Sequence, residues 1–349
     1  MLATINDSRS DEIIAGTVVL TVGLIGNALN IAAVVMIYRT PSLHNAFGFI
    51  CASHLLADVG LLTVFSFWAA PMLLFGAPES LTQSYIGKRM GQLVVLFWYA
   101  SIYGQLQIAL NRLLAIISPL MYSSVVCVRV WKVWKEHNNF PWKPHSLMPS
   151  WHEAPIMQAL STHDHASSVA IFELGTWGAK DGCTFAFHVD MLFWSYAKTE
   201  CGQTLALYLA FFHGAILCAI VVIIDTIAFL AILKNAKKLR KSIGKAQETI
   251  MLKNNVRLYG QGCVQALCFV LAILAFHFTP GLLTTKWSRF ATLTAGWEFV
   301  HAVDGLILIL FHEKFRVLLC HPSSLWQKAA PPTSATPRYN FSILTEKPR

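Results

Sequence analysis

The chain has 349 residues, of which 55% are hydrophobic and 13% are charged, and its formal net charge is +9. A soluble domain carries about 25% charged residues, so this composition excludes an ordinary soluble protein. The fold class that it predicts is an all-α polytopic membrane protein, whose helices satisfy their backbone polar groups internally.

Six stretches of the chain are apolar enough and long enough to cross the ~30 Å hydrocarbon core of a bilayer. These predicted spans are residues 13–37, 46–75, 90–117, 204–233, 259–285 and 290–311. Residues 1–12 are polar and net negative, and Asn6 begins a glycosylation sequon. Because Arg39 follows the first span, the charge difference across that span favours an extracellular N-terminal tail.

The stretch between the third and fourth of these spans is atypical. Residues 128–180 carry charges and prolines throughout and contain no spanning segment. With an external N-terminus, six crossings would leave residues 234–257, which hold eight basic residues and one acid, on the external side. That arrangement violates the positive-inside rule, so either a seventh crossing lies within 118–203 or the N-terminus is cytoplasmic.

The cysteines suggest two modifications outside the spans. Cys183 and Cys201 lie in a polar stretch and could form a disulfide if that stretch is extracellular. Cys320 follows the last span closely and is a candidate palmitoylation site. The tail at 319–349, rich in Pro, Ser and Thr, is expected to be disordered and cytoplasmic.

The third span ends in the pair Asn111-Arg112. The helix from Gly91 to Asn111 is about 30 Å long, so Arg112 falls where it leaves the lipid. There its charge can reach the headgroups or other helix ends, whereas at the bilayer centre it would cost several kcal/mol.

Ionisable groups inside spans are functional candidates because exposing them to lipid is costly. Asp58, near the middle of the second span, could form a hydrated or cation-filled pocket, or could simply bond to a neighbouring helix. Asn27 and Asn30 are its predicted partners. Asp225 could pair with Arg112, line a cytoplasmic-side cavity, or serve helix packing alone.

The last span carries a polar stripe of Glu298, His301 and Asp304, which share one helix face and must point inward. The stripe could line a ligand pocket at Glu298 and a switch region at Asp304, or it could be a proton relay. Pro280 is expected to kink its helix, with Phe278 packing at the kink. The candidate ligand-pocket residues are Trp98, Tyr99, His277, Glu298 and His301.

No catalytic motif, phosphate loop or zinc-binding helix occurs, so we predict that the chain is not an enzyme and needs no cofactor or metal. The basic residues lack interleaved base-reading elements, which argues against nucleic-acid binding.

Six blocks of the sequence carry a resemblance to a known family: Gly26-Asn27, Ser42–Gly60, Ile86–Tyr122, Cys183–Phe187, Glu200–Gly202 and Val221–Leu230. With these blocks the chain resembles the Srx-type class of nematode serpentine chemoreceptors, distant relatives of rhodopsin-like G-protein-coupled receptors. The resemblance covers roughly residues 13–127 and 181–318. It implies a seven-helix receptor domain over 13–318 in the plasma membrane of sensory neurons, with a degenerate or missing fourth helix.

The resemblance also implies a function. The receptor would bind a small molecule or peptide from outside and signal through a helix rearrangement to a heterotrimeric G protein. The switch or coupling residues would be Asp58, Asn111, Arg112, Asp225, Phe278, Pro280 and Asp304. Asn111 replaces the family's acidic residue, so any restraint on Arg112 must come from elsewhere.

Two other interpretations remain open at this stage. The chain could be a six-helix transporter or channel in which Asp58, Asp225, Glu298 and Asp304 form a transmembrane path. It could also be a nonfunctional receptor fragment in which a gene-model error produced residues 128–180.

Overall fold

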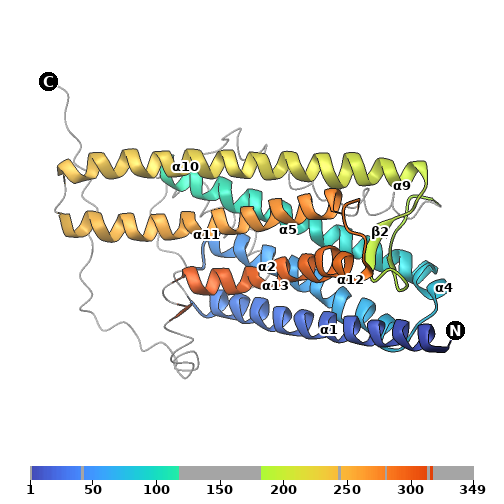
Figure 1. The fold of residues 1–349 in the computed structure, drawn as a ribbon. Coiled ribbons are helices and arrows are strands. Elements are labelled where there is room, and N and C mark those ends of the chain that lie inside the picture. The colour runs from blue at the N-terminus through green and yellow to red at the C-terminus, as the bar shows by residue number, and fades with distance from the viewer. Residues whose placement is uncertain are drawn as a thin grey trace, which may run out of the picture.

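The computed structural model describes residues 2–40, 43–117, 182–242, 245–279, 281–312 and 315–316, without the side chains of 2–8, 235–255 and 258. These residues form a bundle of long helices that run nearly parallel or antiparallel to one another (Figure 1). The long helices are α1 (Leu2–Arg39), α2 (Ala46–Val64), α5 (Tyr85–Ile117), α10 (Gly214–Ser242), α11 (Lys245–Phe278) and α13 (Gly296–Phe311). The short helices are α3 (Ala70–Leu74), α4 (Glu79–Thr82), α9 (Glu200–Thr204) and α12 (Lys286–Arg289).

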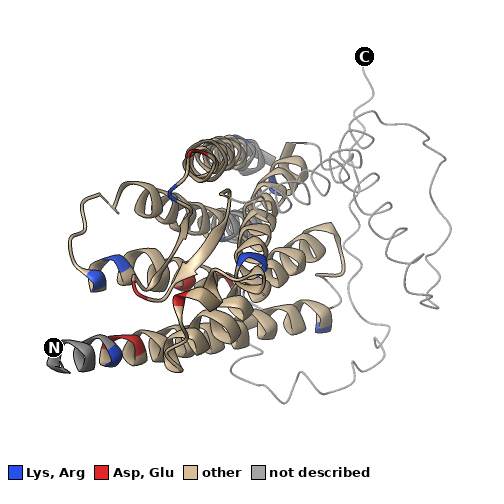
Figure 2. Cartoon of the chain, turned by 90° about the vertical axis from the view of Figure 1, so that its right-hand side faces the viewer, with Lys and Arg blue, Asp and Glu red and all other residues tan. Residues whose placement is uncertain are grey.

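Six helical stretches in the described part of the chain are long and apolar enough to cross a membrane. They correspond one to one with the predicted spans, and charged residues interrupt the described helices rarely (Figure 2). The helices extend beyond the predicted limits: α1 already begins at Leu2, and α5 begins at Tyr85 instead of residue 90. Polar residues continue these helices because backbone hydrogen bonds, once started, propagate without an apolar face.

Three of the spanning helices contain a π-helical segment. These segments are η2 (Phe65–Ala69) between α2 and α3, η4 (Leu205–His213) between α9 and α10, and η5 (Phe290–Ala295) between α12 and α13. A π segment inserts one extra residue into a helical turn and changes which side chains face the bundle.

The prediction that Pro280 kinks a helix that continues past it is wrong. Helix α11 ends at Phe278, two residues before the proline, and the chain leaves it in a turn at Gly281 and Leu282. The reason is steric, because the residue before a proline is driven out of the helical region. Pro280 itself lies outside the described residues.

An antiparallel hairpin covers one end of the bundle. Strands β1 (Phe185–His188) and β2 (Phe193–Tyr196) pair with Phe185 opposite Tyr196. A disulfide joins Cys183, just before β1, to Cys201 in α9. The carbonyl of Phe185 lies 1.7 Å from the point where a Cβ on Gly91 would stand, so only glycine lets the strand approach α5 this closely.

The two described residues that flank the stretch 118–181 lie at opposite ends of the bundle. The C-terminal end of α5 at Ile117 lies far from the hairpin, whereas Gly182 leads directly into β1 at the hairpin end (Figure 1).

Candidate functional site

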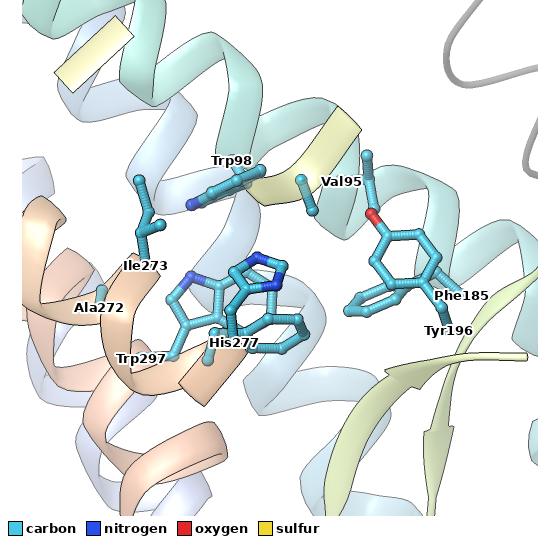
Figure 3. A pocket seen from close by; sticks show the side chains of 10 residues that line it. Val95, Trp98, Phe185, Tyr196, Ala272, Ile273, His277 and Trp297 are labelled. Carbon is cyan, nitrogen blue, oxygen red and sulfur yellow. The ribbon is translucent and has the colours of Figure 1, made fainter. Parts of the chain in front are cut away.

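An aromatic pocket lies beneath the hairpin, and its cavity volume is about 30 Å³. Strands β1 and β2, the helices α5, α11 and α13, and the segment η4 all contribute to its wall. The lining residues are Val95, Trp98, Phe185, Tyr196, Ala210, Ala272, Ile273, Phe276, His277 and Trp297. Their side chains converge from elements far apart in the sequence (Figure 3).

Trp297 is the central side chain of this wall. Its ring centroid lies 6.4 Å from that of Trp98, 6.2 Å from that of Phe185 and 5.7 Å from that of Phe276, in edge-on arrangements. Such geometry is favourable for aromatic pairs and holds each ring against the others. The wall is therefore a preformed apolar surface with few polar groups, mainly those of Trp98, Tyr196 and His277.

Two of the predicted pocket residues, Trp98 and His277, line this pocket, and three do not. Tyr99 is buried and donates a hydrogen bond from its hydroxyl to the carbonyl of Leu209 at 2.8 Å. Glu298 and His301 are fully buried on other sides of α13. Sequence spacing placed Glu298 on the inward face, but Trp297 occupies the pocket side of that turn.

A second hollow lies beside the aromatic pocket and shares Tyr196, Phe276 and His277 with it. It runs along β2 and α9 and includes Lys198 and Gln203. Burial raises the pKa of Tyr196 above its ordinary value, because a phenolate there would lose its hydration.

A buried His–Asp cluster, consisting of His54, Asp58, His301 and Asp304, lies one helical turn below the pocket. The hydroxyl of Ser101 donates a hydrogen bond to Asp58 Oδ1 at 2.7 Å. His301 Nδ1 lies within hydrogen-bond distance of the same oxygen atom, also at 2.7 Å. His54 Nε2 lies 3.4 Å from Asp58 Oδ2 and 3.3 Å from Asp304 Oδ2. None of the four side chains is more than 1% exposed.

Two amides complete the surroundings of the cluster. Gln105 Nε2 lies 2.9 Å from His54 Nε2, and Gln265 Nε2 donates to Asp304 Oδ1 at 3.3 Å. Four helices thus meet at the cluster: α2, α5, α11 and α13. Each supplies a side chain that would be costly to bury without a partner.

The prediction that Asn27 and Asn30 are the partners of Asp58 is wrong. Asn30 donates instead to the carbonyls of Gly26 and His301, each at 3.0 Å, and Asn27 Oδ1 has no hydrogen-bond partner among the described residues. Asp58 is bonded by Ser101 and His301 because α2 packs its polar face toward α5 and α13.

Sequence reasoning missed His54 as a site residue, although a usable signal was present. His54 precedes Asp58 by four residues, so both side chains lie on one helix face. The glutamines and Ser101 carried no such signal, because uncharged polar residues are common in spanning helices.

Toward the opposite end of the bundle, Arg112 of α5 pairs with Asp225 of α10. The distance from Arg112 Nη1 to Asp225 Oδ1 is 3.5 Å, and both side chains are buried, as is Asn111. A Cβ on Gly262 of α11 would stand 1.8 Å from Arg112 Nη1 and 2.8 Å from Asp225 Oδ2. Three helices therefore close around this ion pair, and the glycine makes the space for it.

The remaining predicted site residues are scattered. Phe278 is 56% exposed and packs edge-on against Phe211 with ring centroids 5.3 Å apart. It is therefore not packed inside the bundle at a kink. Asn6 lies within the helix α1, where its side chain is outside the described part. Cys320 and residues 128–180 also lie outside it.

The four carboxyls that a transport path would need are not joined to one another. Asp58 and Asp304 share His54, whereas Asp225 pairs with Arg112. Neither carboxylate oxygen of Glu298 has a hydrogen-bond partner among the described residues.

Comparison with solved structures places the fold among seven-helix receptors. The structure is similar to squid rhodopsin with a TM-score of 0.61 over 91% of this chain and 87% of that one, at 15% sequence identity. At such low identity the similarity concerns the fold alone.

Comparison of sequences is more specific. The chain is 23% identical over 326 residues to serpentine receptor class X 45 of Caenorhabditis elegans, covering 88% of this chain and 81% of that receptor. The family model for the serpentine type 7TM GPCR chemoreceptor Srx matches residues 20–134 and 160–312. The two matched segments include both strands and all six long helices apart from the beginning of α1. The chain therefore belongs to the Srx family of serpentine seven-transmembrane chemoreceptors, and it is a multi-pass membrane protein of the receptor class.

Proposed function

We propose that the chain is a chemosensory receptor of the plasma membrane that binds a small, mainly apolar molecule in the aromatic pocket. In this proposal, binding rearranges the helices and activates a heterotrimeric G protein at the opposite end of the bundle. The observation that carries the proposal is the preformed aromatic pocket, closed over by a hairpin that a disulfide attaches to α9.

The wall of the pocket supports this ligand class. Small-molecule sites are concave and mostly apolar, with a few polar groups that fix the orientation of the ligand. Here the rings of Phe185, Phe276 and Trp297 supply apolar contact, and Tyr196 and His277 supply polar atoms. A ligand with one aromatic or aliphatic body and one hydrogen-bonding group matches that distribution, whereas a multiply charged ligand does not.

Trp297 connects the pocket with the His–Asp cluster. Its ring centroid is 6.5 Å from that of His301, which follows one turn later on α13. His301 bonds Asp58 on α2 and contacts the edge of Phe269 on α11 at 5.5 Å. A ligand that moves Trp297 therefore acts on α13, and the next turn of this helix makes polar contacts with α2 and ring contacts with α11.

The Arg112–Asp225 pair supports the second half of the proposal. Since Asn111 provides no acidic neighbour, Asp225 of α10 takes the role of restraining Arg112 in the resting arrangement. Separation of α5, α10 and α11 would release the guanidinium toward the basic segment 234–257, which comprises the end of α10 and the beginning of α11 and where a G protein would bind. Such two-state helix movements are a common means of switching.

A G-protein activation assay in cells that express the receptor tests the proposal. A library of small apolar volatile and amphiphilic compounds is screened for ligands that raise signalling. The Ala272→Phe variant, which places a ring in the pocket, is expected to raise the half-maximal concentration of a found ligand tenfold or more. The matched control is Leu271→Phe, because Leu271 is 55% exposed and faces away from the pocket wall.

Equal responses of the two variants would contradict the location of the site. Absence of G-protein activation by any compound, combined with ligand-dependent ion or solute flux, would contradict the receptor mechanism itself.

A further inference from the structure

Three side chains that can bind metals meet at the tip of the hairpin, outside both the aromatic pocket and the His–Asp cluster. Glu79 is the first residue of α4, His188 ends β1, and Asp190 lies in the turn between the two strands. One ligand atom from each residue lies within 4.8 Å of the other two. Since Glu79 and His188 are 109 residues apart in the sequence, no local motif reveals this set.

The carboxylate of Glu79 is already fixed in position. Its Oε2 atom accepts a hydrogen bond from the backbone N–H of Val189 at 3.1 Å, and Gln83 Nε2 donates to Oε1 at 3.0 Å. His188 Nδ1 lies 2.8 Å from the same Oε1 atom. Carboxylates that bind metals are oriented by such outer hydrogen bonds. The Oε1 atom and the imidazole nitrogen therefore face each other while Oε2 holds the turn.

The turn that carries Asp190 is fastened on its other side as well. Leu192 is fully buried and has a φ of 62°, a left-handed conformation that is uncommon for residues other than glycine. Its carbonyl accepts a hydrogen bond from Thr294 Oγ1 in η5 at 2.8 Å. These bonds at Val189 and Leu192 hold the backbone on both sides of Asp190, whose side chain is exposed to solvent.

We propose that Glu79, His188 and Asp190 form a binding site for one Zn²⁺ ion. Zinc accepts imidazole and carboxylate ligands together, and three protein ligands leave its fourth position for water. The two carboxylates offset the charge of the divalent ion. Tetrahedral zinc bonds place ligand atoms about 3.4 Å apart, so His188 Nδ1 and Glu79 Oε1 need to separate by only about 0.6 Å to admit the ion.

The position of the site allows zinc to reach it from the outside. The hairpin lies at the same end of the bundle as the beginning of α1, which the sequence predicts to be extracellular (Figure 1). The side chain of Glu79 is 39% exposed and that of His188 is 20% exposed. Zinc would join α4 to the strand whose other end places Phe185 in the aromatic pocket. An effect on ligand exchange would rest on the proposed function, whereas the metal site does not.

Zinc binding to the purified full-length receptor in lipid nanodiscs tests the proposal. The purification tag is removed, no pocket ligand is added, and a fluorescent zinc indicator serves as the competitor. The background variant is His163→Ala/His165→Ala, because the sequence His163-Asp164-His165 offers a second set of zinc ligands. This background variant is expected to bind one Zn²⁺ per receptor. Adding His188→Ala is expected to raise the half-saturating zinc concentration about tenfold or more.

Two further variants keep the test decisive if the loss of His188 disturbs the hairpin. Asp190→Asn changes an exposed side chain, and Glu79→Gln retains an oxygen that can accept the N–H of Val189. Each removes a negatively charged ligand and is expected to weaken zinc binding about tenfold or more. The matched control is Glu200→Gln, at an exposed carboxyl group of α9 at the same end of the bundle, which should bind zinc like the background variant.

Three results would overturn the proposal. The first is that the background variant binds no zinc at micromolar concentrations. The second is zinc binding that is unchanged by both His188→Ala and Glu79→Gln, which would place the ion elsewhere. The third is competition by calcium as strong as that of zinc, which would identify a carboxylate site for hard cations without a role for the imidazole. Because the titration contains no pocket ligand, failure of the signalling assay would refute the proposed function and leave the zinc site standing.

Discussion

The aromatic pocket and the His–Asp cluster lie one helical turn apart and share the helices α5, α11 and α13. The pocket is lined by apolar rings, whereas the cluster consists of buried ionisable side chains. Trp297 and His301 of α13 are four residues apart, yet the first lies in a wall of rings and the second among carboxylates. Rings tolerate small shifts because dispersion and apolar burial depend weakly on direction. Buried polar groups depend on particular partners, so each loss leaves another group unsatisfied. The pocket can therefore adapt to a ligand, whereas the cluster should rearrange as a unit.

The largest effect on stability is expected for Asp58→Ala in the His–Asp cluster. The substitution leaves Ser101 and His301 without their acceptor and leaves the imidazole of His54 with one carboxylate fewer. Removing one member of a buried ionic network costs about 3–5 kcal/mol, which should appear as a large loss of thermal stability in detergent or nanodiscs. Thr63→Ala, at an exposed position of the same helix, is the control. Equal stability of both variants would show that the cluster is not a cooperative unit.

On the pocket side, the corresponding test is the loss of the disulfide. Replacing both Cys183 and Cys201 by serine opens a loop with a sequence separation of 18 and is expected to cost about 2–4 kcal/mol. The hairpin should become sensitive to protease, and ligand affinity should fall while the remaining helices stay folded. Cys268→Ser, at a free cysteine of α11, serves as control. If the double variant retains ligand affinity and protease resistance, packing alone holds the hairpin.

Gly262→Ala tests the ion pair below the cluster. The added methyl would collide with Arg112 Nη1 and displace Asp225, at a cost of about 1–3 kcal/mol from overpacking. Basal G-protein signalling should rise because the restraint on Arg112 is lost. The matched control is Gly260→Ala on the same helix, where the new Cβ meets only Phe311 at 3.2 Å. Unchanged basal signalling with both variants would argue against a restraining role for the pair.

The smallest expected effect concerns Tyr196 at high pH. Since burial raises the pKa of Tyr196, the folded protein holds this proton more tightly than the unfolded chain does. Its contribution to stability is therefore complete below about pH 10, the ordinary value for tyrosine, and declines as the pH rises further. Spectroscopic titration of phenolate absorbance should show a late-titrating fraction that becomes smaller by one tyrosine in Tyr196→Phe. A late-titrating fraction that is unchanged in this variant would contradict the assignment.

The sequence predicted some regions of the molecule better than others, because hydropathy reports on a single segment whereas contacts between helices depend on two. The six spans were predictable because backbone burial in lipid requires long apolar helices, whatever their neighbours. The inward orientation of the stripe from Glu298 to Asp304 was also predictable, and all three of its side chains are fully buried. Pairing with Arg112 was one of three roles considered for Asp225, because both residues were expected near the cytoplasmic ends of their helices, and the structure shows this pair.

The pocket residues were harder to predict. Phe185 and Tyr196 reach the pocket from a hairpin, and Ala210, Ala272 and Trp297 come from three different helical segments. Nothing in local spacing distinguishes such residues from ordinary core or lipid-facing residues. The π segments shift the facing side chains by one position, so helical periodicity across them points to the wrong face.

By itself, the sequence determined that this chain is a helical membrane protein with Srx-family blocks and with costly polar groups inside its spans. Periodicity and hydropathy suffice for that, because they reflect each segment's interaction with lipid and water. Only the tertiary structure decided which polar groups meet. It places Asp58 beside His301, Arg112 beside Asp225, and Glu298 against the backbone of Gly23. Those choices depend on how helices rotate and approach one another, and close approach at glycines is a property of two surfaces together.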